Sequence, residues 1–317
     1  SRGLGDVYKR QMERPTIVLD SADRYNKLYG LPTAHPLVSV VDLNHATSGI
    51  NHARVHYGMY ALFLKQGVQC TLRYGRRKYD YQEGTVVSFA PGQIVDVDHD
   101  NATTAMDVVG VLFHPDLIYG TPLGKRIRDF AFFDYSQNEA VHLSEDERAV
   151  FLDCLDKIKR ELDHPVDRHS ASLLSATIQV LLEYMHRFYD RQFITRHKAN
   201  SDVVAAFEKR LKEFFDNGTA SEEGMPSVAY FADLAHLSAG YFGDLIKKET
   251  GRTPKELITQ HLVDAAKQRL AASDEDIALI AYDMGFQYPA HFTRLFKRVT
   301  GVSPRSYREA LDRSLLN

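Results

Sequence analysis

Basic side chains at helical spacing near the C-terminus could bind another molecule. Arg294, Lys297 and Arg298 lie three and four residues apart within the stretch 277–307. A helix with that spacing keeps its charges on one face and its apolar residues on the other. Arginine and lysine on an exposed helix face can bond to base edges and phosphates in a DNA groove. The predicted chemistry is therefore non-covalent binding of double-stranded DNA.

Two short amphipathic helices would position these side chains. Apolar residues recur at three- and four-residue steps on both sides of residues 285–289, where glycine and proline indicate a tight turn. Two helices around a tight turn form a helix-turn-helix pattern, whose second helix enters the major groove. The apolar positions are Ile277, Ile280, Ala281, Met284, Phe292, Leu295, Phe296 and Val299.

The same pattern occurs a second time, earlier in the chain. A shift of 50 residues aligns Phe242 with Phe292 and Gly251 with Gly301, and before the turn the shift is 49. Each glycine can end a helix as a left-handed cap, and a proline three residues later can begin the next one. We predict helix-turn-helix units at about 228–250 and 277–300, joined rigidly by one helix over 254–272, with a leading helix over 202–216.

The second unit resembles the signature of the AraC/XylS family of bacterial transcription regulators, over about residues 202–310. The resemblance implies a DNA-binding domain preceded by a cupin-like sensor domain. It also implies an effector bound in the sensor barrel and dimerisation through helices beside it. The residues in register are Gly285, Phe286, Phe292, Phe296, Lys297, Gly301 and Pro304.

Helix geometry and the resemblance agree on the DNA-contacting face of the second unit. Arg294 is the first candidate for base contact, because arginine can bond bidentately to guanine. Thr293, His291 and Ala290 are further base-contact candidates. Phosphate contacts are predicted for Gln287, Lys297, Arg298 and Arg305. The alternative is an ordinary solvated face.

The first unit carries smaller and more acidic residues on the equivalent face. Gly240, Gly243 and Asp244 occupy the base-contact positions. Asp244 would repel phosphates, although it could accept a hydrogen bond from cytosine N4. We therefore expect this unit to read little sequence. Its predicted phosphate contacts are Ser238, Tyr241, Lys247 and Lys248.

The first part of the chain has a different texture. Residues 12–143 contain short runs of β-branched and aromatic residues, separated by turn signals, which predicts a small β-barrel or sandwich. The predicted fold is multi-domain α+β: an N-terminal cupin-like β-barrel with flanking helices, then a C-terminal all-α tandem helix-turn-helix domain over 202–317. A small-molecule effector could lie among Tyr57, Tyr60, Arg73, Tyr74, Tyr79 and Tyr81.

A cupin-type metalloenzyme with an appended DNA-binding domain is the alternative function. Such enzymes use two histidines and a carboxylate, but this chain has no closely spaced His-x-His followed by glutamate. We predict no metal, no cofactor and no catalysis. A third alternative is an architectural DNA binder without an effector. The loosely grouped histidines are His45, His52, His56, His99 and His114.

Residues 144–190 are expected to form two helices. Ser144 and Glu147 are spaced as a capping box. The second helix has a wide apolar stripe, so it is either buried or a subunit interface. Residues 191–201 are expected to be a linker. Residues 1–11 show no pattern and are expected to be a non-native leader before Met12, with a genuine disordered tail as the alternative.

Composition excludes several classes of protein. The net charge is -3, so any DNA contact must come from local patches. Two cysteines give no disulfide framework, and no apolar run reaches the ~18 residues of a membrane span. We expect a cytoplasmic homodimer that activates transcription. Its partners would be double-stranded DNA, a small-molecule effector and RNA polymerase, with no membrane.

Overall fold

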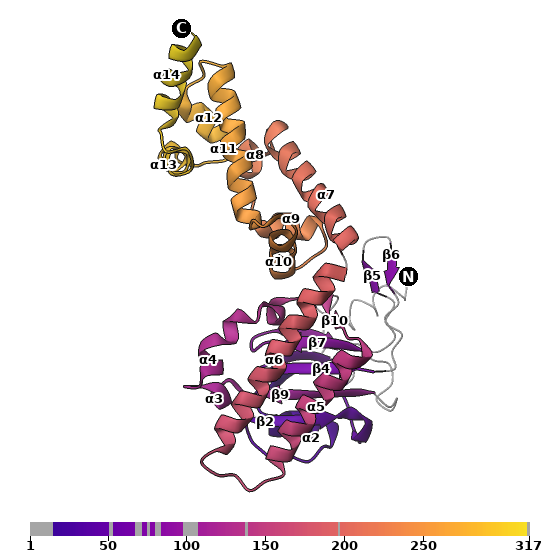
Figure 1. The fold of residues 1–317 in the computed structure, drawn as a ribbon. Helices are drawn as coiled ribbons and strands as arrows, with labels where there is room; N and C mark the ends of the chain where they lie inside the picture. The colour runs from indigo at the N-terminus through magenta and orange to yellow at the C-terminus, as the bar shows by residue number, and fades with distance from the viewer. Residues whose placement is uncertain are drawn as a thin grey trace, which may run out of the picture. The chain divides into compact units, whose positions relative to one another are not determined.

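A computed structural model gives the fold in two compact units, residues 1–195 and 196–317, each described here by itself (Figure 1). The structure describes residues 15–50, 53–66, 72–74, 77–79, 84–97, 107–136, 139–195 and 197–315. The expected leader, residues 1–11, lies outside this description. None of the described helices is long and apolar enough to cross a membrane.

Unit 1 is built on a five-stranded antiparallel sheet and a three-stranded sheet. The larger sheet has the order β10-β7-β4-β9-β2. In the smaller sheet, β3 pairs with β1 in parallel and with β8 antiparallel. The strands are β1 (Thr16–Leu19), β2 (Val38–Asp42), β3 (Ala53–Tyr57), β4 (Tyr60–Lys65), β7 (Thr85–Phe89), β8 (Ile94–Val97), β9 (Val108–Phe113) and β10 (Val141–His142), with a separate hairpin of β5 (Leu72–Tyr74) and β6 (Arg77–Tyr79).

Among the described residues, an aromatic core fills the space between the two sheets. Tyr57 of β3 stacks on Phe89 of β7 with ring centroids 4.5 Å apart. Phe63 of β4 and Tyr25 of α2 (Ala22–Tyr29) belong to the same buried cluster. Among the described strands the sheets stay separate and do not close into one barrel. The predicted α+β sheet domain is confirmed, but the closed cupin-like barrel is not.

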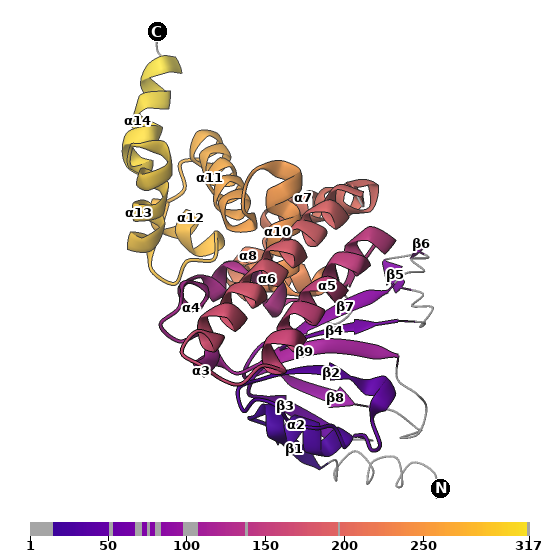
Figure 2. The same ribbon diagram turned by 60° about the horizontal axis from the view of Figure 1, so that its bottom comes forward.

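Two long helices cover the other face of the five-stranded sheet (Figure 2). They are α5 (Glu145–Leu162) and α6 (Ser170–Thr195). Phe151 of α5 and Ile178 of α6 are fully buried. The predicted capping box is confirmed: the Glu147 N–H donates to Ser144 Oγ at 3.3 Å, and the Ser144 N–H donates to Glu147 Oε2 at 3.0 Å. The short helices α3 (Pro115–Ile118) and α4 (Pro122–Arg126) precede them.

The segment 191–201, expected to be a linker, is largely helical. Helix α6 runs to Thr195, and α7 begins at His197. Arg191 pairs with Glu147 at 2.6 Å, and the Gln192 side chain accepts from the His142 N–H at 2.9 Å. These contacts hold the C-terminal end of α6 against the rest of unit 1. They also give hydrogen-bond partners to polar groups at this buried sheet edge.

Unit 2 repeats one helix pair around a central helix. The pairs α9–α10 and α12–α13 correspond to the two predicted helix-turn-helix units, and α11 joins them. The left-handed caps are confirmed at Gly251 (φ 75°) and Gly301 (φ 83°). The helices are α7 (His197–Asp216), α8 (Thr219–Glu223), α9 (Val228–Leu234), α10 (Ala239–Thr250), α11 (Pro254–Ala272), α12 (Ile277–Asp283), α13 (Pro289–Thr300) and α14 (Pro304–Leu315).

Candidate nucleic-acid interface

The turn between α12 and α13 fixes the recognition-type helix of the second pair. Gly285 has φ 87°, a conformation that side chains other than glycine rarely adopt. A Cβ at this position would lie 2.7 Å from the backbone carbon of Gly224. The Phe286 N–H donates to the Ala281 carbonyl at 3.0 Å, and the Phe286 ring meets that of Phe292 at 5.6 Å. Backbone fit and ring packing therefore determine where α13 points.

Ion pairs also hold α12 against the central helix α11. The Arg269 guanidinium on α11 pairs with Asp283 at 2.7 Å and with Glu275 at 2.6 Å. Partial burial acts to lower the pKa of Arg269, but hydrogen bonds to the two carboxylates outweigh it and raise that pKa above its ordinary value. Sequence reasoning missed this group, since pairs between loops and different helices leave no periodic signal.

Helix α13 divides sharply into a buried and an exposed face. Phe292 and Phe296 have no exposed surface, as the three- and four-residue spacing requires. All the residues predicted to contact bases from this helix are accessible: Ala290, His291 and Arg294 are exposed, and Thr293 is half-buried.

The exposed face of α13 is a concentrated positive patch. Lys297 and Arg298 are exposed beside Arg294. Within the described residues, no carboxylate lies within ion-pair distance of these three side chains. Outside α13, Gln287 is exposed, whereas Arg305 pairs with Glu309 at 3.0 Å. Exposed pairs of that kind are weak, so Arg305 can exchange its partner for a phosphate.

The first helix pair offers fewer accessible side chains for DNA contact than the second. Tyr241 has no exposed surface, so its side chain is not accessible to a phosphate as the prediction requires. Helix α7 lies against α10, and Phe207 of α7 meets the neighbouring Phe242 with ring centroids 5.3 Å apart. Ser238 caps α10 by accepting from the Tyr241 N–H at 3.2 Å.

The remaining positions predicted in the first pair stay accessible. Gly240, Gly243 and Asp244 are half-buried, and Lys247 and Lys248 are exposed. A Cβ added at Gly243 would meet nothing within 4 Å. Neither packing nor backbone conformation therefore requires a glycine at position 243.

Of the predicted effector residues, only Tyr57 and Tyr60 have described side chains, and the structure places these two apart. Tyr57 lies in the core between the sheets, where burial raises the pKa of its phenol far above the usual range. Tyr60 belongs to the opposite face of the five-stranded sheet. Its ring stacks on Phe113 with centroids 5.2 Å apart and meets the tilted ring of Phe133 at 4.9 Å. Arg73, Tyr74 and Tyr79 lie in β5 and β6, whose side chains are outside the described part, as is Tyr81.

Two of the histidines considered for the metalloenzyme alternative have other partners in the described structure. His45 pairs with Asp42 at 3.1 Å. His114 caps α3 by accepting from the Asp116 N–H at 3.2 Å. His52 and His99 lie outside the described residues. Across the residues that the structure describes, no three His, Cys, Asp or Glu side chains are grouped to hold a metal ion.

Comparisons with known proteins identify relatives of this chain. A family model described as a helix-turn-helix domain matches residues 231–310. The regulator YobQ of Bacillus subtilis is 32% identical over 27% of this chain, and the activator RhaS of Escherichia fergusonii is 36% identical over 26%. A regulator of Haemophilus influenzae is 22% identical over 83% of this chain and 90% of its own length.

For two of these relatives the match covers only about a third of the protein, 35% of YobQ and 30% of RhaS. Among solved structures, the C-terminal domain of the response regulator AraT from Geobacillus stearothermophilus is 25% identical. It covers 34% of this chain and 84% of that chain, with a TM-score of 0.31.

The repeated helix pairs and the family match define unit 2 as a helix-turn-helix DNA-binding domain. It is of the AraC type, and the resemblance to the AraC/XylS family of transcription regulators is confirmed.

Proposed function

We propose that this chain is a sequence-specific DNA-binding transcription regulator that reads bases mainly with α13. The observation that carries the proposal is the α13 face, where Arg294, Lys297 and Arg298 are exposed without carboxylate partners among the described residues. Basic residues at that spacing suit a major groove lined by phosphates. The relatives named above are regulators, and no feature of the described residues favours the metalloenzyme.

Helix α10 takes a supporting part in this proposal. With α11 as a rigid spacer, α10 and α13 would enter major-groove segments roughly one helical turn, ~10 bp, apart. Gly240, Gly243 and Asp244 offer little for base reading, whereas Lys247 and Lys248 can hold phosphates. The test is selection of duplexes from a randomised pool by the full chain. Enrichment of one motif supports the proposal, and recovery of an unselected pool overturns it.

We propose that unit 1 is a cupin-like sensor domain acting in the cytoplasm, where bacterial DNA lies. Two facing sheets around one core support this. The relative RhaS is named a transcriptional activator, which supports a role for this chain in activating transcription, with RNA polymerase as its partner. The architectural alternative draws support from the filled core. Measuring DNA affinity with and without a panel of metabolites separates a sensor from an architectural DNA binder, since only a sensor changes its affinity for DNA when a metabolite binds.

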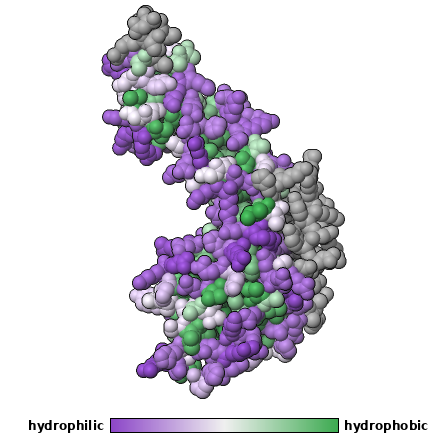
Figure 3. Space-filling view, in the orientation of Figure 1, coloured by the Kyte–Doolittle hydropathy of each residue, from purple (hydrophilic) through white to green (hydrophobic). Residues whose placement is uncertain are grey.

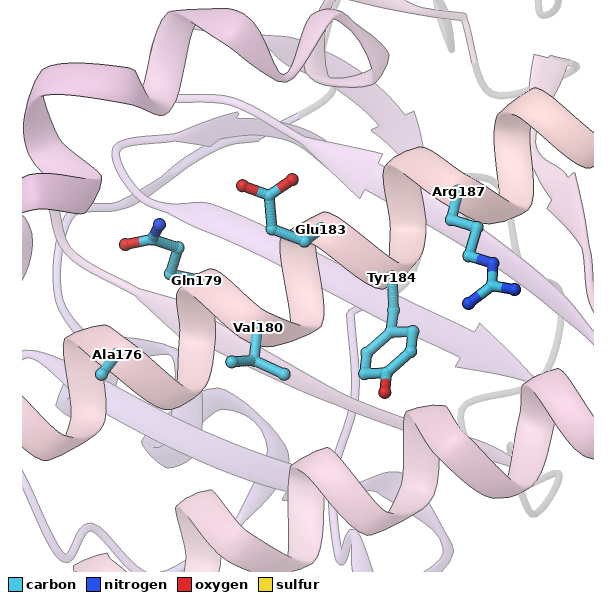
Figure 4. A pocket seen from close by; sticks show the side chains of 6 residues that line it. All are labelled: Ala176, Gln179, Val180, Glu183, Tyr184 and Arg187. Atoms are coloured by element: carbon cyan, nitrogen blue, oxygen red, sulfur yellow. The ribbon is translucent and has the colours of Figure 1, made fainter.

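We also propose that the protein is a homodimer formed through the outer face of α6. Leu173 and Val180 are 51% and 50% exposed on this helix. Hydrophobic side chains gather on this side of unit 1 (Figure 3). A groove of about 560 Å³ runs along the helix, lined by Ala176, Gln179, Val180, Glu183, Tyr184 and Arg187 (Figure 4).

The spacing of this face is the same in both directions from Val180. Ala176 and Tyr184 lie four residues away on either side, and Leu173 and Arg187 lie seven away. In an antiparallel pair with its two-fold axis at Val180, each Ala176 therefore faces the partner's Tyr184. A small residue then meets a large one, and the stem of Arg187 covers Leu173. Steps of three and four suit coiled-coil packing.

Molar mass in solution tests the dimer. Val180→Glu should give monomers, because two carboxylates would meet on the axis, while Val166→Glu, at a 72% exposed residue outside this face, should leave the dimer intact. Ala176→Lys should also dissociate the dimer, and adding Tyr184→Glu should restore it through a new ion pair. A dimeric Val180→Glu variant would overturn the proposal.

A further inference from the structure

The two recognition-type helices begin differently. The repeat places Tyr288 at the position of Ser238. Ser238 caps α10 by accepting from a backbone N–H, whereas the Tyr288 side chain makes no cap hydrogen bond. Helix starts favour serine, threonine, aspartate or asparagine, because their short side chains satisfy the free N–H groups. The second unit therefore gives up a stabilising contact at the end of the helix that would enter DNA.

Burial of the tyrosine ring does not replace this contact. Tyr288 is 62% exposed. Its ring instead meets the ring of His291 edge-on, with centroids 5.6 Å apart and planes at 61°. The backbone reinforces the contact, since the His291 N–H donates to the Tyr288 carbonyl at 2.9 Å and Pro289, which follows Tyr288, has a fixed φ.

We propose that Tyr288 is a positioning residue for base recognition: its ring holds the His291 imidazole in one orientation toward the DNA. The inference rests on the proposed function and deepens it. An exposed histidine samples several rotamers, and each presents its ring nitrogens to a different base edge. The Tyr288 ring blocks part of that range, so His291 accepts fewer bases.

The position of the pair on α13 indicates what it would read. His291 lies three residues before Arg294, on the same exposed face. A base next to the one that Arg294 contacts is therefore within reach of His291. Tyr288 itself would touch no base edge and would act through the imidazole.

The experiment measures base preference for the full chain on a set of duplexes varied one base pair at a time. Tyr288→Ala and His291→Ala should each lower the preference at the same base pair about tenfold, within the range of a good base contact. The double variant should lower it no further. Tyr288→Phe keeps the ring and should keep the preference.

Tyr288→Ser separates positioning from a structural role. It restores the cap found in α10 and should raise the melting temperature while relaxing the same base preference. If Tyr288→Ser and Tyr288→Ala keep the wild-type preference, the inference is wrong. Relaxation at a different base pair from His291→Ala would also overturn it. If the wild-type chain shows no base preference at all, the proposed function itself fails.

Discussion

Arg294 reaches back along its own helix, with Nε donating to the carbonyl oxygen of Ala290 at 3.4 Å. This is a long hydrogen bond on an exposed surface, so breaking it costs little. The side chain is otherwise exposed, and the Ala290 carbonyl lies within α13, where a backbone N–H one turn later can satisfy it when the side chain leaves. Arg294 can therefore move from Ala290 to a base edge without disturbing the helix.

Arg294→Ala should weaken binding to the selected site by ~1–3 kcal/mol and relax specificity at one base pair. The reason is loss of two hydrogen bonds to one guanine. Arg294→Lys is the matched variant, since it keeps the charge and loses the fork geometry. It should recover affinity more than specificity. Unchanged binding of Arg294→Ala to the cognate duplex would remove this residue from the interface.

Lys297→Ala should weaken binding evenly across sequences. Lys297 is exposed one turn after Thr293, and its ammonium suits a phosphate better than a base. Loss of one phosphate contact should reduce the slope of log affinity against log salt by about 0.9. A salt titration on cognate and random duplexes measures this, with Lys297→Arg as the control. A change in base preference would contradict the phosphate role.

Gly285→Ala should destabilise unit 2. The positive φ alone costs about 1–3 kcal/mol, and the new Cβ would collide with the backbone of Gly224. Because this contact holds the turn before α13, DNA affinity should fall too. Thermal unfolding of the full chain, followed by circular dichroism, shows the change. A variant as stable as the wild type would mean that the turn is not held as described.

Gly243→Ala should act on stability in the opposite direction. Residue 243 lies within α10 with open space around it, so alanine should stabilise the helix by about 0.8–1 kcal/mol. If α10 lies close to the DNA backbone, the added methyl should lower affinity even as stability rises. A higher DNA affinity of this variant would show that α10 does not lie close to the DNA backbone.

The helices of the fold could be predicted from sequence because their signals are local. Gly251 and Gly301 end their helices as predicted, and Ser144 with Glu147 forms the expected capping box. The exposed face of α13 followed from the spacing of Phe292 and Phe296. Each of these features depends on residues within one or two turns of each other.

The features that the sequence did not reveal depend on contacts between distant segments. Tyr241 of α10 is buried, although its repeat partner His291 is exposed. Tyr57 and Tyr60 are three residues apart, yet they lie on opposite sides of the five-stranded sheet. The ion pair between Arg269 and Asp283 joins two helices, α11 and α12. Periodicity shows which face of an element is apolar, but not which neighbour covers it.

A hydroxyl-radical footprint of the full chain on its selected duplex tests the central claim most directly. We predict two protected segments roughly one turn, ~10 bp, apart on one face of the DNA. The segment under α13 should lose its protection in Arg294→Ala more than the segment under α10 does. Protection on opposite faces of the duplex, or no protected segment at all, would contradict the account.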